Sequence, residues 1–215
     1  MITLHTWSTP NGMKVQIMLE ECGLPYRLHP VNLGKGQQHG AEFRALNPNG
    51  KIPVLVDDEA PGGPFVEWES GAILFYLAEK TGRFLAPGPL GRHRTLQWVM
   101  FQMSGLGPMV GQLHHFVGSA PERLPYAVDR FTNESKRILG VMDQRLATSA
   151  HLADAAYTIA DICTWPWVRS WLHTVHQTLD GFPHVKRWFD AIEQRPAVAK
   201  AVETYVALRA APKPA

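Results

Sequence analysis

The chain has 215 residues, of which 45% are hydrophobic and 19% are charged, so it can bury a core and is not a disordered chain. Its 21 basic and 19 acidic residues leave a net charge of +2, which excludes an electrostatic argument for binding nucleic acid or an anionic membrane. The two cysteines, Cys22 and Cys163, are too few for a disulfide scaffold, a CxxC pair or a cysteine-based zinc cluster.

The first residues form a strand-like segment without the basic start, apolar run and cleavage site of a secretory signal. No segment offers the roughly 18 uninterrupted apolar residues that a transmembrane helix needs. We therefore expect a cytoplasmic protein that contacts no membrane, and the low cysteine content agrees with a reducing compartment.

Strands and short helices alternate over residues 1–84. Apolar runs and turn residues predict strands and helices in the order β-α-β-α-β-β-α, at residues 2–6, 13–22, 26–31, 41–46, 54–56, 65–66 and 69–80. A βαβ unit followed by a ββα unit is typical of a thioredoxin-like domain with a mixed four-stranded sheet.

Helical patterns dominate after the Pro- and Gly-rich linker at residues 85–90. The predicted helices lie near residues 91–117, 124–148, 158–173, 183–194 and 197–208. Thr158 and Asp161 have the spacing of a capping box, and Pro108 could kink the first helix. The fold class is therefore an α/β thioredoxin-like domain over 1–84 and an all-helical domain over 91–215.

The segment from Trp7 to Val15 joins the first strand to the first helix. Amide hydrogens at a helix N-terminus bind an anion or a thiolate, and Thr9 and Asn11 add a hydroxyl and a side-chain amide. On spacing alone, one of these two residues could simply cap the helix.

Two later segments have comparable chemistry. Pro53 enters a buried strand and leaves the backbone of Ile52 free to pair with an extended peptide, while Lys51 can meet a carboxylate. Glu69 can accept from an ammonium, and Ser70 opens a helix that can bind an anion. Each segment alone also fits an ordinary strand entry or helix cap. Together the three segments favour a small peptide ligand with amine and carboxylate groups.

These residues resemble those of the cytosolic glutathione transferases over essentially the whole chain. The resemblance rests on Lys51-Ile52-Pro53, Glu69-Ser70 and the Thr158–Asp161 box. The motifs Thr9-Pro10-Asn11-Gly12-x-Lys14-Val15, Leu33 to Gln38 and Gly105 to Phe116 are similar to the nu class, the bacterial disulfide-bond oxidoreductase group related to the yeast nitrogen-regulating prion protein. Ala153 to Ala156 departs from the family, where a glycine usually precedes the box.

The resemblance implies a role for each matching residue. Thr9 and Asn11 would hydrogen-bond the glutathione sulfur as the catalytic residues. Glutathione binding would fall to the residues that match the family's peptide site, namely Gln38, Lys51, Ile52, Pro53, Glu69 and Ser70, and to Arg130 across a homodimer interface. No metal is implied. A second substrate would meet the helical domain, for which we name Phe101, Met109 and His114.

The implied function is a glutathione-dependent disulfide-bond reductase that uses the thiolate of bound glutathione, since both cysteines are expected to be packing residues. The implied partners are glutathione, reduced or oxidised, and a small disulfide or electrophile. A glutathione lyase or a transferase that conjugates an aromatic or electrophilic substrate is an alternative. A non-catalytic regulator or interaction module of the same fold is another.

Overall fold

The computed structural model describes residues 1–210, which form two compact units. The N-terminal unit contains Met1–Thr81 together with residues 195–210, and the helical unit contains Gly82–Gln194. The domain division expected from the sequence grouped the last helix with the helical domain, whereas its contacts group it with the N-terminal unit. Residues 211–215 of the expected helical domain lie outside the described residues.

The N-terminal unit is built on a four-stranded sheet. The strands β1 (Ile2–Thr6), β2 (Tyr26–Pro30), β3 (Val54–Asp57) and β4 (Phe65–Trp68) lie in the order β2-β1-β3-β4. β1 runs parallel to β2 and antiparallel to β3, and β4 pairs antiparallel with β3. This mixed sheet confirms the predicted thioredoxin-like arrangement.

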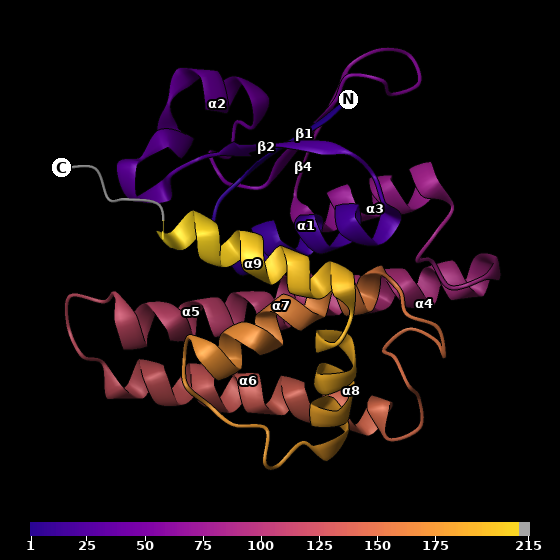
Figure 1. The fold of residues 1–215 in the computed structure, drawn as a ribbon. Coiled ribbons are helices and arrows are strands. Elements are labelled where there is room, and N and C mark those ends of the chain that lie inside the picture. Colours follow the sequence, from indigo (N-terminus) through magenta and orange to yellow (C-terminus); the bar gives the residue numbers. More distant parts are fainter. Residues whose placement is uncertain (211–215) are drawn as a thin grey trace. The chain divides into compact units, whose positions relative to one another are not determined.

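Helices cover both faces of this sheet (Figure 1). α1 (Pro10–Cys22) and α3 (Ser70–Thr81) lie on one face, and α2 (Ala41–Leu46) lies on the other. Along β1 the buried Leu4 alternates with the half-buried His5, as expected for a strand between two layers. Phe43 of α2 packs on Val31 and Val54. Two single turns, η1 (Leu33–Lys35) and η2 (Gln37–His39), connect β2 to α2.

The last helix, α9 (Pro196–Ala210), lies beside α1 (Figure 1). The Arg195 guanidinium forms two bonds of 2.5 and 2.8 Å with the Glu21 carboxylate, and Lys200 pairs with Glu20 at 2.7 Å. A bidentate arginine–carboxylate pair is stronger and more specific in direction than a single ion pair. These pairs, together with the buried Val198, Ala201 and Leu208 of α9, join the last helix to the N-terminal unit.

The helical unit contains α4 (Gly88–Phe101), α5 (Gly107–Gly118), α6 (Pro125–Leu146), α7 (Ile159–His173) and α8 (Pro183–Glu193). Helical backbone covers the whole span predicted as one helix over 91–117, but a π-helix, η3 (Gln102–Leu106), divides it into α4 and α5. Pro108 has no amide hydrogen to continue the regular bonding, and Gly107 lets the backbone approach the Gln102 side chain. The buried Gln102 then accepts a bond from Cys163 at 2.9 Å.

The predicted capping box opens α7. The Thr158 hydroxyl oxygen accepts from the Ala160 amide, and the Asp161 carboxylate accepts from the Thr158 amide at 3.0 Å. Asp161 is fully buried and also accepts from the Leu152 amide and the Trp188 indole, each at 2.9 Å. One carboxylate therefore joins α7, α8 and the preceding loop.

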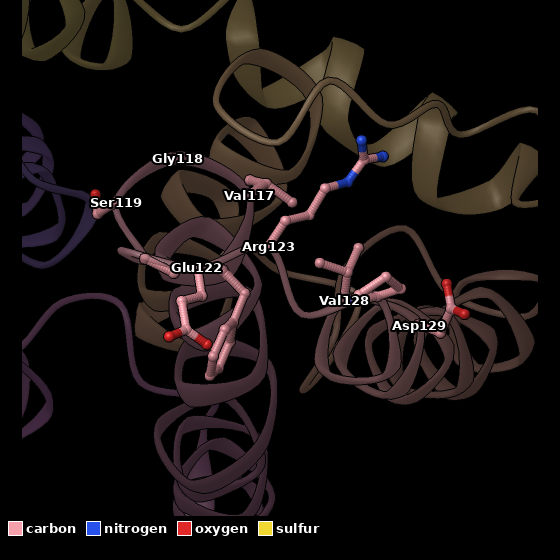
Figure 2. Close-up of a pocket in the computed structure, with 10 residues that line it drawn as sticks. Val117, Gly118, Ser119, Glu122, Arg123, Val128 and Asp129 are labelled. Atoms are coloured by element: carbon pink, nitrogen blue, oxygen red, sulfur yellow. The ribbon is translucent and has the colours of Figure 1, made fainter.

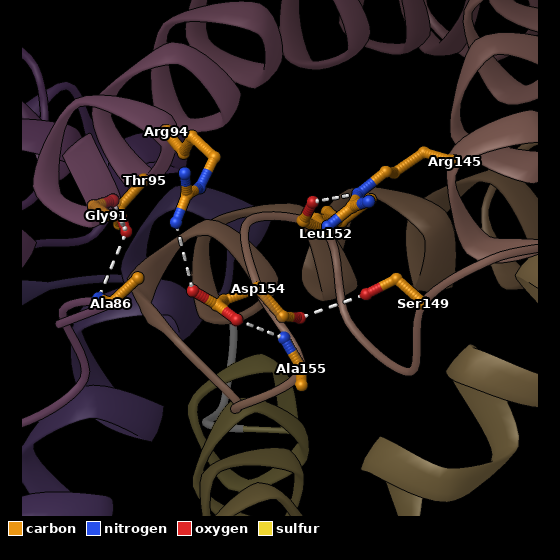
Figure 3. Close-up of polar contacts among 9 residues, drawn as sticks. All are labelled: Ala86, Gly91, Arg94, Thr95, Arg145, Ser149, Leu152, Asp154 and Ala155. Carbon is orange, nitrogen blue, oxygen red and sulfur yellow. Dashed lines mark hydrogen bonds and ion pairs between the residues drawn. The ribbon is translucent and has the colours of Figure 1, made fainter.

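The loop before α7 contains the residues that depart from the glutathione transferase pattern. Figure 3 shows how hydrogen bonds hold it: Arg145 donates to the Leu152 carbonyl at 2.7 Å, and Ser149 donates to the Asp154 carbonyl at 3.1 Å. The Asp154 carboxylate accepts from the Ala155 amide at 2.7 Å and faces Arg94 at 3.4 Å. The loop is thus tied to α6 and α4 without a glycine. Within residues 1–210, no helix is long and apolar enough to span a bilayer.

Replacing Asp161 with alanine is expected to destabilise the protein by about 3–5 kcal/mol, because four buried donors, the Leu152 and Thr158 amides, the Thr158 hydroxyl and the Trp188 indole, lose their acceptor at once. Chemical denaturation followed by circular dichroism measures this loss. The exposed Asp180 provides the control, and Asp180→Ala is expected to stay within about 0.5 kcal/mol of the wild type. Equal stability of the two variants would contradict this role of Asp161.

Candidate functional site

The end of β1 and the start of α1 are fixed by Thr9. Its hydroxyl oxygen accepts a hydrogen bond of 3.1 Å from the Gly12 amide, so Thr9 is the N-cap of α1. Pro10 occupies the first helical turn, where its missing amide hydrogen is not needed. The capping interpretation is confirmed, and it leaves the Thr9 hydroxyl proton unused by the cap. Thr9 can therefore cap the helix and donate to a ligand.

Gly12 is required by a close approach at this junction. A Cβ atom on Gly12 would lie 2.7 Å from the Trp7 carbonyl oxygen and would also clash with the Thr6 hydroxyl. The backbone oxygen cannot move without shifting the end of β1. The absence of a side chain at Gly12 therefore lets α1 begin directly against the strand.

The segment before β3 is shaped by Asn47. Its side-chain amide donates to the Lys51 carbonyl at 2.7 Å, and its carbonyl oxygen accepts from the Asn49 amide at 2.9 Å. The Ile52–Pro53 peptide bond that follows is cis. The buried Asn47 thus holds the turn that carries Lys51 and Ile52.

Glu69 and Ser70 occupy the junction between β4 and α3. Glu69 has a φ angle of 72°, in the left-handed region, and α3 therefore begins at Ser70 and not at Glu69 as predicted. Such a conformation in a residue other than glycine is a local strain of the kind found at ligand sites. The Ser70 side chain is buried and accepts a bond of 3.2 Å from the Lys14 ammonium.

These three segments meet at one small cavity of about 50 Å³. Residues from every segment line it: Asn11, Asn47, Lys51, Ile52, Pro53, Glu69 and Ser70. An amide donor, an ammonium, a free carboxylate and a helix N-terminus therefore face one space. This set can bind an extended peptide that carries a carboxylate and an amine.

The other predicted residues lie apart from this cavity. Thr9 is not among its lining residues but precedes Asn11 by two positions. Gln38 belongs to η2, and its side-chain oxygen is buried without a hydrogen-bond partner among the described residues. The remaining four belong to the helical unit: the half-buried Phe101 and Met109, and the exposed His114 and Arg130.

Two larger cavities contain none of the predicted site residues among the described residues that line them. One, of about 580 Å³, lies between the sheet and α2 and contains His5 and His29. Burial, and then the charge of His29, lower the pKa of His5. The other, of about 510 Å³, lies where α5 meets α6, where Figure 2 shows Arg123 and Asp129 at its wall. Volume alone does not identify the site, because only the small cavity, of these three, is lined by residues of the three predicted segments.

Asn47 and Lys14 lie within segments that the sequence singled out, but sequence reasoning assigned neither of them a role in the site. Asn47 precedes a proline and opens an Asn-Pro-Asn-Gly turn, a signal for side-chain bonding to the local backbone. Lys14 lies among buried apolar residues of α1 and is 1% exposed. A lysine on the apolar face of a predicted helix is a detectable signal, since lysine is rarely buried unless it is paired. Within residues 1–210, no group of three or more metal-ligating side chains is present.

Comparison with known proteins gives the family. Residues 9–80 match the glutathione S-transferase N-terminal domain, and residues 108–196 match the glutathione S-transferase C-terminal domain. The chain belongs to the glutathione S-transferase family. It is 48% identical over 206 residues to the disulfide-bond oxidoreductase YfcG of Escherichia coli, covering 94% of each chain.

Solved structures agree with this family. A glutathione transferase family member from Pseudomonas fluorescens, with two glutathione bound, matches at a TM-score of 0.91 and 44% identity, covering 94% of this chain and 92% of the other. A glutathione transferase from Pseudomonas putida, with one glutathione disulfide bound per subunit, matches at 0.89 and 43%, covering 94% and 90%. The recognised fold and family are confirmed.

Replacing Gly12 with alanine is expected to destabilise the protein by about 1–3 kcal/mol through overpacking against the Trp7 carbonyl. The control is Gly140→Ala in α6, where the new Cβ meets its nearest atom at 4.0 Å and the gain in helix propensity is kept. Denaturant titration of both variants measures the difference. A Gly12→Ala variant as stable as Gly140→Ala would refute the close approach.

Proposed function

We propose that this protein is a glutathione-dependent disulfide-bond reductase of the nu class. The observation that carries the proposal is the cavity where Asn11, Ile52 and Ser70 meet from three separate segments. Two relatives support it: YfcG is named a disulfide-bond oxidoreductase, and the Pseudomonas putida structure holds glutathione disulfide. Glutathione is the substrate that supplies the thiol.

Glutathione has two ends of different charge, and the site has complementary groups for both. The Ser70 amide and hydroxyl, at the start of α3, receive the γ-glutamyl carboxylate, and the exposed Glu69 receives the γ-glutamyl ammonium. The Ile52 backbone pairs with the cysteinyl unit beside Pro53. Lys51 and Gln38 bind the glycyl carboxylate end.

The sulfur of glutathione then lies at the start of α1. A free thiol has a pKa of about 8.5, so only a small part is ionised at neutral pH. Hydrogen bonds from Thr9 and Asn11, together with the helix N-terminus, stabilise the thiolate and lower its pKa. The chain itself supplies orientation and electrostatic stabilisation, while the reacting sulfur belongs to glutathione.

Disulfide reduction needs two thiols. The thiolate of one glutathione attacks a substrate sulfur, forms a mixed disulfide and releases the first substrate thiolate, which takes up a proton. The thiolate of a second glutathione attacks the glutathione sulfur of the mixed disulfide and releases the second substrate thiolate. The products are one glutathione disulfide and two substrate thiols, so electrons and protons balance.

The helical unit supplies the remaining parts of the proposal. Phe101, Met109 and His114 contact the second substrate, and Arg130 reaches a glutathione bound to the partner in a homodimer. Arg130 is exposed on α6, as a residue that acts on another subunit must be. We place the protein in the cytoplasm, where glutathione is abundant and cysteines stay reduced.

The thiolate donors are tested by Asn11→Ala and Thr9→Ala, with Thr9→Ser as the control that keeps both the hydroxyl and the helix cap. Loss of either donor is expected to lower kcat/KM for a small disulfide roughly 5- to 150-fold, which corresponds to a loss of about 1–3 kcal/mol of transition-state stabilisation. The thiol pKa of bound glutathione, followed by ultraviolet absorbance, is expected to rise in both alanine variants. Unchanged kinetics in both alanine variants and in their double variant would remove these residues from the mechanism.

The cysteines are tested by a double variant, Cys22→Ala with Cys163→Ser. Cys163 donates to Gln102 in the helical unit, and serine keeps that donor; Cys22 is half-buried with its sulfur 3.6 Å from the Thr81 hydroxyl. Disulfide reductase activity with glutathione is expected to remain within about threefold of the wild type, a free-energy change below 1 kcal/mol. Loss of activity in a variant that still folds and binds glutathione would assign the redox chemistry to a protein cysteine.

The partner contact is tested by Arg130→Ala, with Lys136→Ala on the same helix as the exposed control. Glutathione binding by calorimetry is expected to weaken about tenfold in Arg130→Ala, because a charge-assisted bond is lost. Sedimentation reports whether the dimer remains. Identical dissociation constants in the two variants would discard the contact.

A wild-type chain that shows no thermal shift with millimolar reduced or oxidised glutathione would instead be a non-catalytic module.

A further inference from the structure

The buried lysine of α1 has no role in the function described so far. Lys14 is 1% exposed and lies one helical turn after Asn11 among the buried Met13, Val15 and Ile17. An ammonium group loses its hydration when it is buried, so an apolar side chain would be the favourable choice at this position. The charge at Lys14 therefore calls for an explanation in the site beside it.

The contact of Lys14 points to the site. Its ammonium nitrogen lies 3.2 Å from the Ser70 hydroxyl oxygen, and Ser70 is 3% exposed and lines the small cavity. An ammonium group has three donors and no acceptor, so the Ser70 oxygen must be the acceptor in this bond. Lys14 thereby places a positive charge directly behind a side chain that lines the cavity.

Two positive contributions coincide at Ser70. The first is the N-terminus of α3, which begins at this residue. The second is the Lys14 ammonium, whose nitrogen lies 3.2 Å from the Ser70 hydroxyl oxygen. A buried charge acts through a medium of low dielectric constant, so it is felt more strongly than a surface lysine would be. Glu69, the neighbour of Ser70, carries a negative carboxylate, so a positive and a negative binding position lie side by side in the site.

We propose that Lys14 is the positioning residue that makes the site selective for a carboxylate at Ser70. In the proposed function, on which this inference rests, that group is the α-carboxylate of the γ-glutamyl unit. Lys14 and Glu69 together orient an amino-acid head group, with its carboxylate toward Ser70 and its ammonium toward Glu69. A thiol peptide that lacks the carboxylate loses the benefit of the buried charge.

The test compares two ligands on the same folded protein. One is glutathione, and the other is its analogue with a neutral carboxamide in place of the γ-glutamyl α-carboxylate. By calorimetry the wild type is expected to bind glutathione about 10- to 100-fold more tightly than the amide, the range for a hydrogen bond to a charged group. In Lys14→Met, which keeps a long side chain but no charge, this ratio is expected to fall at least tenfold. Lys136→Met is the control with the same change in net charge at an exposed position, and it keeps the wild-type ratio.

A change in the ratio separates positioning from folding, since a general loss of structure weakens both ligands alike. In the background of Ser70→Ala, Lys14→Met is expected to change the ratio less than it does alone, because Lys14 acts partly through Ser70. A wild-type ratio in Lys14→Met overturns the proposal. If that variant does not fold, equal binding of glutathione and the amide by the wild type overturns it just as directly. A wild type that binds neither ligand refutes the proposed function instead.

Discussion

The hydrogen bond between the Gly12 amide and the Thr9 hydroxyl oxygen is the contact on which the candidate site depends. It ends β1 and begins α1 within a few residues, and the bare Cα of Gly12 makes that sharp change of direction possible. The first amide groups of α1 consequently follow closely on the end of β1, in the segment that contains Asn11. The helix cap and the proposed sulfur site are therefore one structural feature. Thr9 can cap α1 through its hydroxyl oxygen and still donate to the sulfur in the proposed site.

Buried polar side chains organise both units. In the helical unit, Asp161 accepts from the backbone of its own helix start, from Leu152 and from Trp188, so its carboxylate replaces the solvent that those donors lost on folding. In the N-terminal unit, burial acts to raise the pKa of Asp57, but hydrogen bonds from Lys80 and Tyr76 outweigh it and hold the pKa low. Lys14 differs from both, because its contact with Ser70 leads to a cavity wall.

The regular elements were largely predictable because their signals are local. Apolar spacing in α1 and the alternation of β1 follow from helix and strand geometry, and the Thr158–Asp161 box is a four-residue motif. The π-helix at Gln102–Leu106 was not predictable, because apolar periodicity does not distinguish an extra residue in one turn from a continuous helix. The start of α3 also shifted by one residue, since only the fold imposes the left-handed backbone of Glu69.

The sequence by itself determined the mixed α/β and helical character, the family resemblance and three segments with anion-binding or peptide-binding chemistry. It could not decide whether those segments were separate helix caps and strand ends, because each pattern is satisfied by its own neighbours. Tertiary structure decided that they meet, since the strand order β2-β1-β3-β4 brings the ends of β1, β3 and β4 together. It also decided that Lys14 faces Ser70, 56 positions later in the chain, a contact that depends on helix packing and that no local pattern encodes.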